Sequence, residues 1–399
     1  MTRKSNNLPA DLRGAASLTI DAIVGITDIV ESLHYTIAGG PKMPDKSARK
    51  RLQGIPGTVY RNVRRITRLA GGVIDLLLEQ LSLLLGEQES VGGREVTLAI
   101  INGVLGDYLA ARNNSLAIPM QLRRHGIALD EEALAVAIQQ GNGRVVVMVH
   151  GLCMNDQQLN RQGHDHGEAL ARDLGLTPVY VRYNSGLHVS ENGRELAELM
   201  ETIVDLSAQP TELTIIGYSM GGLVARSACY YGEILGYGWP AHLRKLLIIG
   251  APNHGAHLER GGNWIDVIMG LSAYSAPFSR LGKIRSSGFT DLRYGNVVDE
   301  DWAGYERFEL AGDQRICVPL PTGVSCYAIA ASMSRNSNKL GDDLIGDGLV
   351  TVNSALGRHN NPAMDLQFPE GHKWVGRNMR HLDLLNHPQV YETIKIFLS

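Results

Sequence analysis

Several features that mark other protein classes are scarce in this chain of 399 residues. It has four cysteines and no C-x-x-C pair, which argues against a disulfide framework and against a zinc site. The net charge of −3 offers no general attraction for nucleic acid, so we expect no nucleic-acid partner. The first eleven residues carry two basic side chains but no apolar run behind them. We therefore expect no secretory signal peptide and a cytoplasmic location.

Long uncharged apolar runs are also missing. A membrane-spanning helix needs about 20 apolar residues, and the nearest candidate, residues 69–85, contains Asp75 and Glu79. With 44% hydrophobic and 20% charged residues the composition is that of an ordinary globular protein. The length allows one large α/β domain with an additional module.

The most informative motif is Gly217-Tyr218-Ser219-Met220-Gly221. An apolar run, Leu213–Ile216, precedes it and a helix-forming segment follows it, so the pattern indicates a strand, a sharp turn and a helix. Glycine is needed on both sides of Ser219 because a Cβ in so tight a turn would strike the neighbouring backbone. The helix start directs its free N–H groups toward negative charge formed beside the serine. This nucleophile elbow suits acyl transfer.

Strands and helices alternate from residue 144 onward, and the continuously apolar strands predict a mostly parallel sheet covered on both faces. We predict a domain over residues 144–399. Its expected strands are Arg144–Val149, Pro178–Arg182, Leu213–Ile216, Lys245–Ile249 and Ser325–Ala330, and its expected helices are Glu168–Leu174, Gly193–Leu206, Leu223–Tyr231 and Val390–Leu398. Residues 256–316 interrupt the alternation with scattered aromatic residues. We interpret them as a cap or lid insertion, with surface packing that has no gating role as the alternative.

The first part of the chain has a different pattern. Residues 1–115 show apolar positions at helical spacing and predict an N-terminal helical region, followed by a connecting segment over 116–143. Within it, residues 42–68 contain nine Lys and Arg residues opposed only by Asp45. This window predicts peripheral contact with an anionic membrane surface. A solvated basic face of a docked helix is the alternative.

A serine nucleophile needs a base and an acid that orients the base, and in this fold both follow the serine in the order acid, then histidine. For the acid we select Asp347, which lies between two glycines after the strand at 325–330; Asp342 and Asp343 lie in the same loop. For the base we select His381, just ahead of the last helix. The other candidates are His359, His372 and His387, and His387 has the alternative role of starting that helix.

The oxyanion of a tetrahedral intermediate requires preorganised N–H donors. One is expected from the backbone of Met220, the residue after the nucleophile. The second is expected from the backbone of Leu152, where the chain leaves the strand at 144–149, with Cys153 as the alternative. We expect His150 to brace this loop through hydrogen bonds. His188, near the carboxyl ends of the strands, is either a substrate contact or a second brace.

These motifs together resemble the bacterial lipases and the related PGAP1-like, GPI inositol-deacylase-like branch of the α/β-hydrolase superfamily. The resemblance covers roughly residues 144–399 and rests on the segments His150–Leu152, Gly217–Gly221, Gly250–Gly255, Asp347–Val350 and His381–Asp383. It implies an α/β-hydrolase fold and ester hydrolysis through an acyl-enzyme. It assigns Ser219, Asp347 and His381 to the triad, and Leu152 and Met220 to the oxyanion site. Asp383 stands where some bacterial lipases bind calcium, but a second upstream carboxylate is missing, so we predict no metal.

The sequence therefore predicts a cofactor-free serine esterase or lipase that acts on a small-molecule acyl ester or lipid. Acyl transfer to an alcohol by the same triad is one alternative. The other is a membrane-surface or interaction protein whose hydrolase domain is secondary or inactive.

Overall fold

The computed structural model describes residues 91–207, 211–256, 286–304, 313, 315–335 and 345–399. Most of them belong to one compact unit, formed by Glu95–Ser275 and Arg285–Ser399. The predicted helices before residue 91, the basic window 42–68 and much of the predicted cap lie outside the described residues, as do Asp342 and Asp343.

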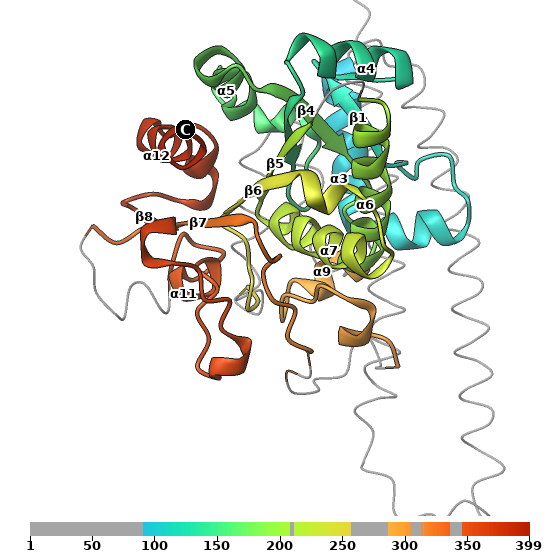
Figure 1. The fold of residues 1–399 in the computed structure, drawn as a ribbon. Coiled ribbons are helices and arrows are strands. Elements are labelled where there is room, and N and C mark those ends of the chain that lie inside the picture. Colours follow the sequence, from blue (N-terminus) through green and yellow to red (C-terminus); the bar gives the residue numbers. More distant parts are fainter. Residues whose placement is uncertain (1–90, 208–210, 257–285, 305–312, 314, 336–344) are drawn as a thin grey trace, which may run out of the picture. The chain divides into compact units, whose positions relative to one another are not determined.

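An eight-stranded sheet forms the centre of this unit, in the order β2-β1-β4-β3-β5-β6-β7-β8 (Figure 1). Six neighbouring strands, β4-β3-β5-β6-β7-β8, pair in parallel, whereas β1 pairs antiparallel with both β2 and β4. The strands are β1 (Gln121–Arg124), β2 (Ile127–Ala128), β3 (Arg144–Val149), β4 (Thr177–Arg182), β5 (Glu212–Tyr218), β6 (Leu243–Ile249), β7 (Ser325–Ser332) and β8 (Lys373–Arg377). This topology confirms the predicted α/β-hydrolase fold.

Helices cover both faces of the sheet, as the apolar strands require. The side chains of β3, β5 and β6 alternate between the faces, and those on one face form a core with α5 and α12. The helices α6 and α7 pack together, and α7 packs on β5 (Figure 1). The helices are α3 (Val91–Ala111), α4 (Glu131–Gln140), α5 (His166–Leu174), α6 (Val189–Asp205), α7 (Met220–Ile234), α9 (Ser287–Asp291), α11 (Val352–Ala355) and α12 (Pro388–Leu398).

Buried ion pairs join α3 to the sheet. Glu95 of α3 accepts hydrogen bonds from Arg182 of β4 at 2.9 Å and from Arg123 of β1 at 3.1 Å. Arg123 also contacts Asp156 at 3.1 Å. Because these side chains are largely withdrawn from water, the charges must neutralise one another. The helix that precedes the predicted hydrolase domain is thus fixed to its sheet.

Two sets of elements were not predicted. Residues 116–143, expected as a connecting segment, contain β1, β2 and α4. The strand β8 is short, and Gly376 is its only buried residue. The strands β1, β2 and β8 lack the continuous apolar run by which the other strands were recognised.

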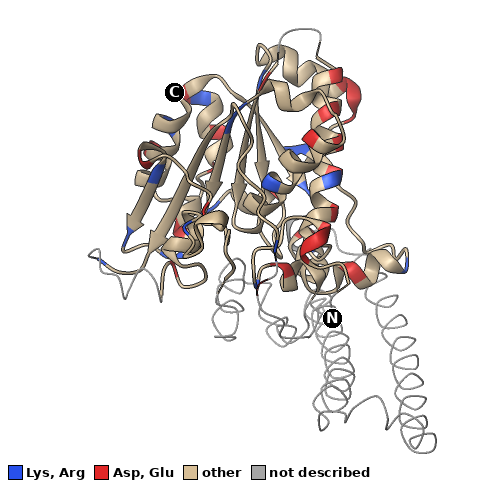
Figure 2. Cartoon of the chain, turned by 60° about the horizontal axis from the view of Figure 1, so that its bottom comes forward, with Lys and Arg blue, Asp and Glu red and all other residues tan. Residues whose placement is uncertain are grey.

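Acidic residues predominate along one side of the described chain (Figure 2). The helix α6 alone carries Glu191, Glu195, Glu198, Glu201 and Asp205. No helix within the described ranges is both long and apolar enough to cross a membrane.

Candidate active site

Ser219 occupies the turn between β5 and α7, at the carboxyl end of the central strands. Its backbone has φ 54° and ψ −124°, a conformation that side-chain-bearing residues rarely adopt. A Cβ on Gly221 would lie 2.2 Å from the carbonyl oxygen of Val149, and one on Gly217 would lie 2.6 Å from the backbone of Gly222. Both glycines are therefore required for steric reasons, as the elbow motif predicts.

His381 and Asp347 are brought together from loops that follow β7 and β8. Nδ1 of His381 lies 2.7 Å from Oδ2 of Asp347, and both side chains are almost completely buried. The backbone amide of His381 also donates to the carbonyl of Asp347 at 3.1 Å. The other carboxylate oxygen, Oδ1, accepts the amides of Leu349 and Val350 at 2.9 and 2.8 Å. These contacts fix the orientation of the carboxylate and, through it, that of the imidazole.

The loop around Gly250 connects His381 with Ser219. The amide of Ser219 donates to the carbonyl of Ile249 at 2.8 Å. A Cβ on the next residue, Gly250, would lie 3.1 Å from Cε1 of His381. Within the described part of the chain, Nε2 of His381 is buried and has no hydrogen-bond partner. The imidazole therefore has one nitrogen engaged with a carboxylate and the other free to accept a proton.

Tyr218, the residue before Ser219, makes a second connection to His381. The two rings lie 5.0 Å apart, and the Tyr218 hydroxyl donates to the backbone carbonyl of His381 at 3.1 Å. Burial, followed by the nearby Asp347 carboxylate, raises the pKa of Tyr218 well above its usual value. The hydroxyl thus remains a donor. No motif predicted this contact, because it depends on how the His381 segment returns over the sheet.

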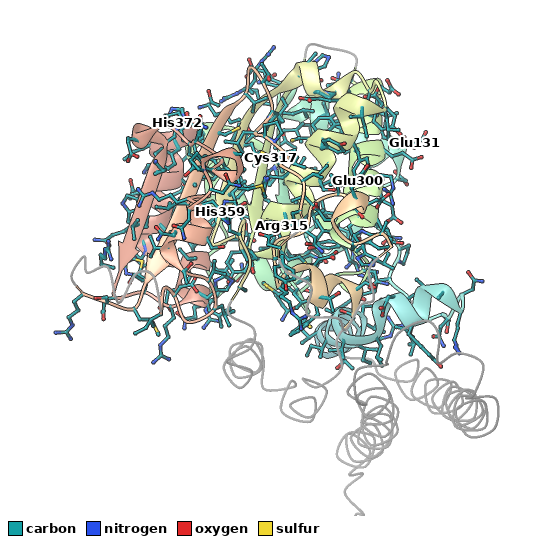
Figure 3. The ribbon with its side chains drawn as sticks, turned by 90° about the horizontal axis from the view of Figure 1, so that it is seen from below. Glu131, Glu300, Arg315, Cys317, His359 and His372 are labelled. Carbon is teal, nitrogen blue, oxygen red and sulfur yellow. The ribbon has the colours of Figure 1, made fainter. Side chains whose placement is uncertain are left out.

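The other candidate histidines have contacts elsewhere (Figure 3 labels two of them). Nδ1 of His372 is hydrogen-bonded to the carbonyl of Cys326, and its ring stacks on Tyr327 at 4.2 Å. His387 caps the start of α12, accepting the amide of Gln389. His359 accepts the amide of Asn361 at 3.1 Å.

The loop after β3 lies directly beside Ser219. A Cβ on Gly151 would lie 3.1 Å from Cβ and 3.5 Å from Oγ of Ser219. The preceding His150 is fully buried, stacks on Tyr183 at 4.2 Å and makes a hydrogen bond from Nδ1 to the carbonyl of Gly151 at 2.9 Å. Burial lowers the pKa of His150 to about 3, so it remains neutral. These contacts are those of a brace for the loop.

The two amides considered for the oxyanion site differ in their partners. The amide of Cys153 donates to Oγ of Ser185 at 3.0 Å. For Leu152, the described residues provide no acceptor for the backbone N–H. Met220 is the first residue of α7, where an amide has no acceptor within its own helix. Burial raises the pKa of the Cys153 thiol to about 12, so this thiol is no competing nucleophile.

Part of the predicted cap packs against the site. Nδ1 of His188 lies 3.0 Å from Asp291 of α9, and its ring stacks on Trp302 at 3.7 Å. The backbone at Gly288 in α9 is close to the loop after β4 and to the start of α7. A Cβ on Gly288 would lie 2.2 Å from the carbonyl oxygen of Ser185 and 2.9 Å from Cε of Met220. His188 therefore braces the contact between α6 and α9, one of the two roles considered for it. Residues 257–285, 305–312 and 314 of the predicted cap lie outside the described residues.

Asp383 makes a local capping contact. Its Oδ2 accepts the amide of Arg380 at 2.8 Å and caps the 3-10 helix η9 (His381–Leu385). Among the residues that the structure describes, no group of three or more His, Cys, Asp or Glu side chains is arranged to hold a metal ion.

In a comparison with known protein families, residues 140–310 match the family model described as the PGAP1-like alpha/beta domain. Solved structures of similar shape include mature Bacillus licheniformis lipase BlEst2, with TM-score 0.40 and 14% identity over 64% of this chain and 91% of that one. Aspergillus fumigatus lipase B gives 0.39 and 12% over 69% and 58%, and Staphylococcus hyicus lipase gives 0.37 and 13% over 64% and 95%. A search of curated protein sequences finds no match.

Proposed function

We propose that the chain is a serine hydrolase that cleaves carboxylic acyl esters through an acyl-enzyme on Ser219. The observation that carries this proposal is the buried contact between His381 and Asp347 beside the elbow that holds Ser219. The match of residues 140–310 to the PGAP1-like family model supports it independently. An alternative use of the same residues, acyl transfer to an alcohol, differs only in the acceptor.

In the acylation half-reaction, Oγ of Ser219 attacks the carbonyl carbon of the ester while Nε2 of His381 takes its proton. The carbonyl π electrons move onto oxygen and form a tetrahedral oxyanion. The amides of Met220 and Leu152 donate hydrogen bonds to it. The carbonyl re-forms, the bond to the alcohol oxygen breaks, and the imidazolium returns its proton to the leaving alcohol.

In the second half-reaction a water molecule takes the place of the alcohol. His381 removes one of its protons as the oxygen attacks the acyl carbon, and a second tetrahedral oxyanion forms. Its collapse releases the carboxylic acid and returns the proton to Ser219. Asp347 accepts the hydrogen bond from Nδ1 of His381, which keeps the proton on that nitrogen and stabilises the transient imidazolium. These steps need no cofactor.

A hydrolysis profile across p-nitrophenyl esters of increasing acyl length tests this function. We expect turnover by the wild-type protein and none above background for Ser219→Ala. Ser227→Ala is a matched control, because Ser227 is a fully buried serine on the same helix that donates to the carbonyl of Val297. It should retain activity. Wild-type turnover equal to that of Ser219→Ala would refute the proposal.

Two further measurements distinguish hydrolysis from acyl transfer and test for membrane contact. Product analysis with added alcohol separates hydrolysis from transfer, since a transferase would form a new ester at the expense of free acid. Co-sedimentation with anionic liposomes, before and after truncation of residues 42–68, tests the membrane contact proposed for that basic window. Unchanged sedimentation after truncation would exclude the window as the membrane contact.

A further inference from the structure

The loop that supplies the Leu152 amide is held in an unusual conformation. Cys153 has φ 57°, in the left-handed region that non-glycine residues rarely adopt. The conformation is fixed on one side by α3, where a Cβ on Gly103 would lie 2.2 Å from Sγ and 2.9 Å from the amide nitrogen of Cys153. Close backbone packing at Gly103 leaves the loop no room to move toward α3.

Ser185 fixes the loop from the other direction. Its Oγ accepts the Cys153 amide at 3.0 Å, and Ser185 is itself 1% exposed. The serine lies in a rigid segment. The preceding Asn184 donates from its side chain to the carbonyl of Gly106 in α3 and accepts the amide of Gly186. On the other side, Gly288 of α9 donates its amide to the carbonyl of Gly186. Oγ of Ser185, which accepts the Cys153 amide, therefore has a defined position.

This hydrogen bond has a consequence for the adjacent peptide. With the Cys153 amide bonded to Ser185, the loop is fixed one residue beyond the N–H of Leu152, which has no acceptor among the described residues. The residue before Leu152, Gly151, lies against Ser219, because a Cβ on Gly151 would lie 3.1 Å from Cβ and 3.5 Å from Oγ of Ser219. A donor that stabilises an oxyanion must be oriented before the reaction begins, because reorientation would add to the barrier.

We propose that Ser185 is a positioning residue that holds the Leu152 amide in the orientation required by the oxyanion. This role rests on the proposed esterase function, whereas the hydrogen bond from the Cys153 amide to Ser185 does not depend on that function. Ser185 lies 34 positions before Ser219 in the sequence and has no motif of its own. Only the folded chain places its hydroxyl against the loop after β3.

The test compares Ser185→Cys, Ser185→Thr and the control Ser227→Ala with the wild type. Cysteine keeps the unbranched shape of the side chain, with a larger sulfur atom in place of oxygen, but is a weak acceptor, whereas threonine keeps the hydroxyl. We expect kcat for a p-nitrophenyl ester to fall about tenfold or more in Ser185→Cys, with KM changed less than about twofold. The inhibition constant of a trifluoromethyl ketone, whose serine adduct carries an oxyanion, should rise by a similar factor. Ser185→Thr should recover most of the loss.

A second measurement separates failure of this inference from failure of the esterase proposal. Hydrogen exchange of the peptide containing residues 150–154 reports the Cys153 amide whether or not the protein turns over esters. We expect faster exchange in Ser185→Cys than in the wild type and in Ser227→Ala. Unchanged exchange, or equal effects on kcat and ketone binding in Ser185→Cys and Ser227→Ala, would overturn the positioning role. Absence of wild-type ester turnover would overturn the proposed function instead.

Discussion

His381 and Asp347 are joined twice, by a side-chain contact of 2.7 Å and by a backbone hydrogen bond of 3.1 Å. The backbone bond ties the loop after β7 to the segment after β8, so the side chains meet because the two loops are paired. The carboxylate accepts two further backbone amides. The dyad is therefore an organised unit, and the His381 ring lies 5.0 Å from that of Tyr218, the residue before Ser219.

Replacing Asp347 by Asn should reduce kcat by about three to four orders of magnitude while leaving the fold intact. An amide that donates to Nδ1 would favour the wrong tautomer of His381, with the proton on Nε2. Steady-state kinetics, with the melting temperature as a check on folding, measure this effect. An Asp347→Asn variant within tenfold of the wild type would remove Asp347 from the proposed triad.

Gly250→Ala should impair activity more than stability. The residue has φ 60°, and an added Cβ would lie 2.8 Å from Leu384 and 3.1 Å from His381. Strain of about 1 kcal/mol is expected from the backbone conformation alone, and relief of the contact would displace His381. The matched control is Gly175→Ala, which has φ 68° and open space at the Cβ position. Equal activity in the two variants would contradict this account.

Glu95 should be important for stability. Glu95→Ala leaves Arg123 without one of its two acidic partners and removes two side-chain hydrogen bonds of Arg182. Loss of one partner in a buried charge cluster costs about 3 to 5 kcal/mol. Urea denaturation of the wild type and the variant measures the change in the free energy of unfolding. A loss below about 1 kcal/mol would mean that the guanidinium groups find other partners or water.

Stability should fall between pH 6.5 and about 4. Burial lowers the pKa of His166 to about 4 and that of His150 to about 3. The unfolded chain then binds protons that the folded chain does not, so stability is complete above pH 6.5 and is lost as the pH falls. Each histidine contributes roughly 1.4 kcal/mol per pH unit in this range.

His166→Gln tests this pH dependence, because a glutamine amide retains a donor for the carbonyl of Leu384 that His166 contacts at 2.9 Å. Denaturation at pH 7.5 and 5.5 should give a smaller difference for the variant than for the wild type. An identical difference in the two proteins would show that His166 does not titrate as expected.

The sequence allowed most of the sheet to be predicted because its central strands are continuously apolar. The strand β3 was predicted with its observed ends, and β5, β6 and β7 within three residues. The elbow was recognisable because steric demands at Gly217 and Gly221 are local. By contrast, β1 and β2 lie at the sheet edge, are short and include charged or exposed residues, so no local pattern identified them.

The selected acid and base lie in contact, yet their neighbours were not predictable. Fold order and loop position favoured Asp347 and His381 over several other candidates. The contacts of Tyr218, Ser185 and Gly250 arise from tertiary packing between segments far apart in the sequence. Their roles depend on which backbone groups the fold brings close, and a single sequence carries no record of that.

The most direct test of the central claim is the rate at which a fluorophosphonate modifies Ser219, with the modified residue identified by mass spectrometry. We predict a single adduct on Ser219 in the wild type and labelling slowed by several orders of magnitude in His381→Ala. His372→Ala should label at nearly the wild-type rate. Modification of another residue, or equally fast labelling in His381→Ala, would contradict a serine activated by His381.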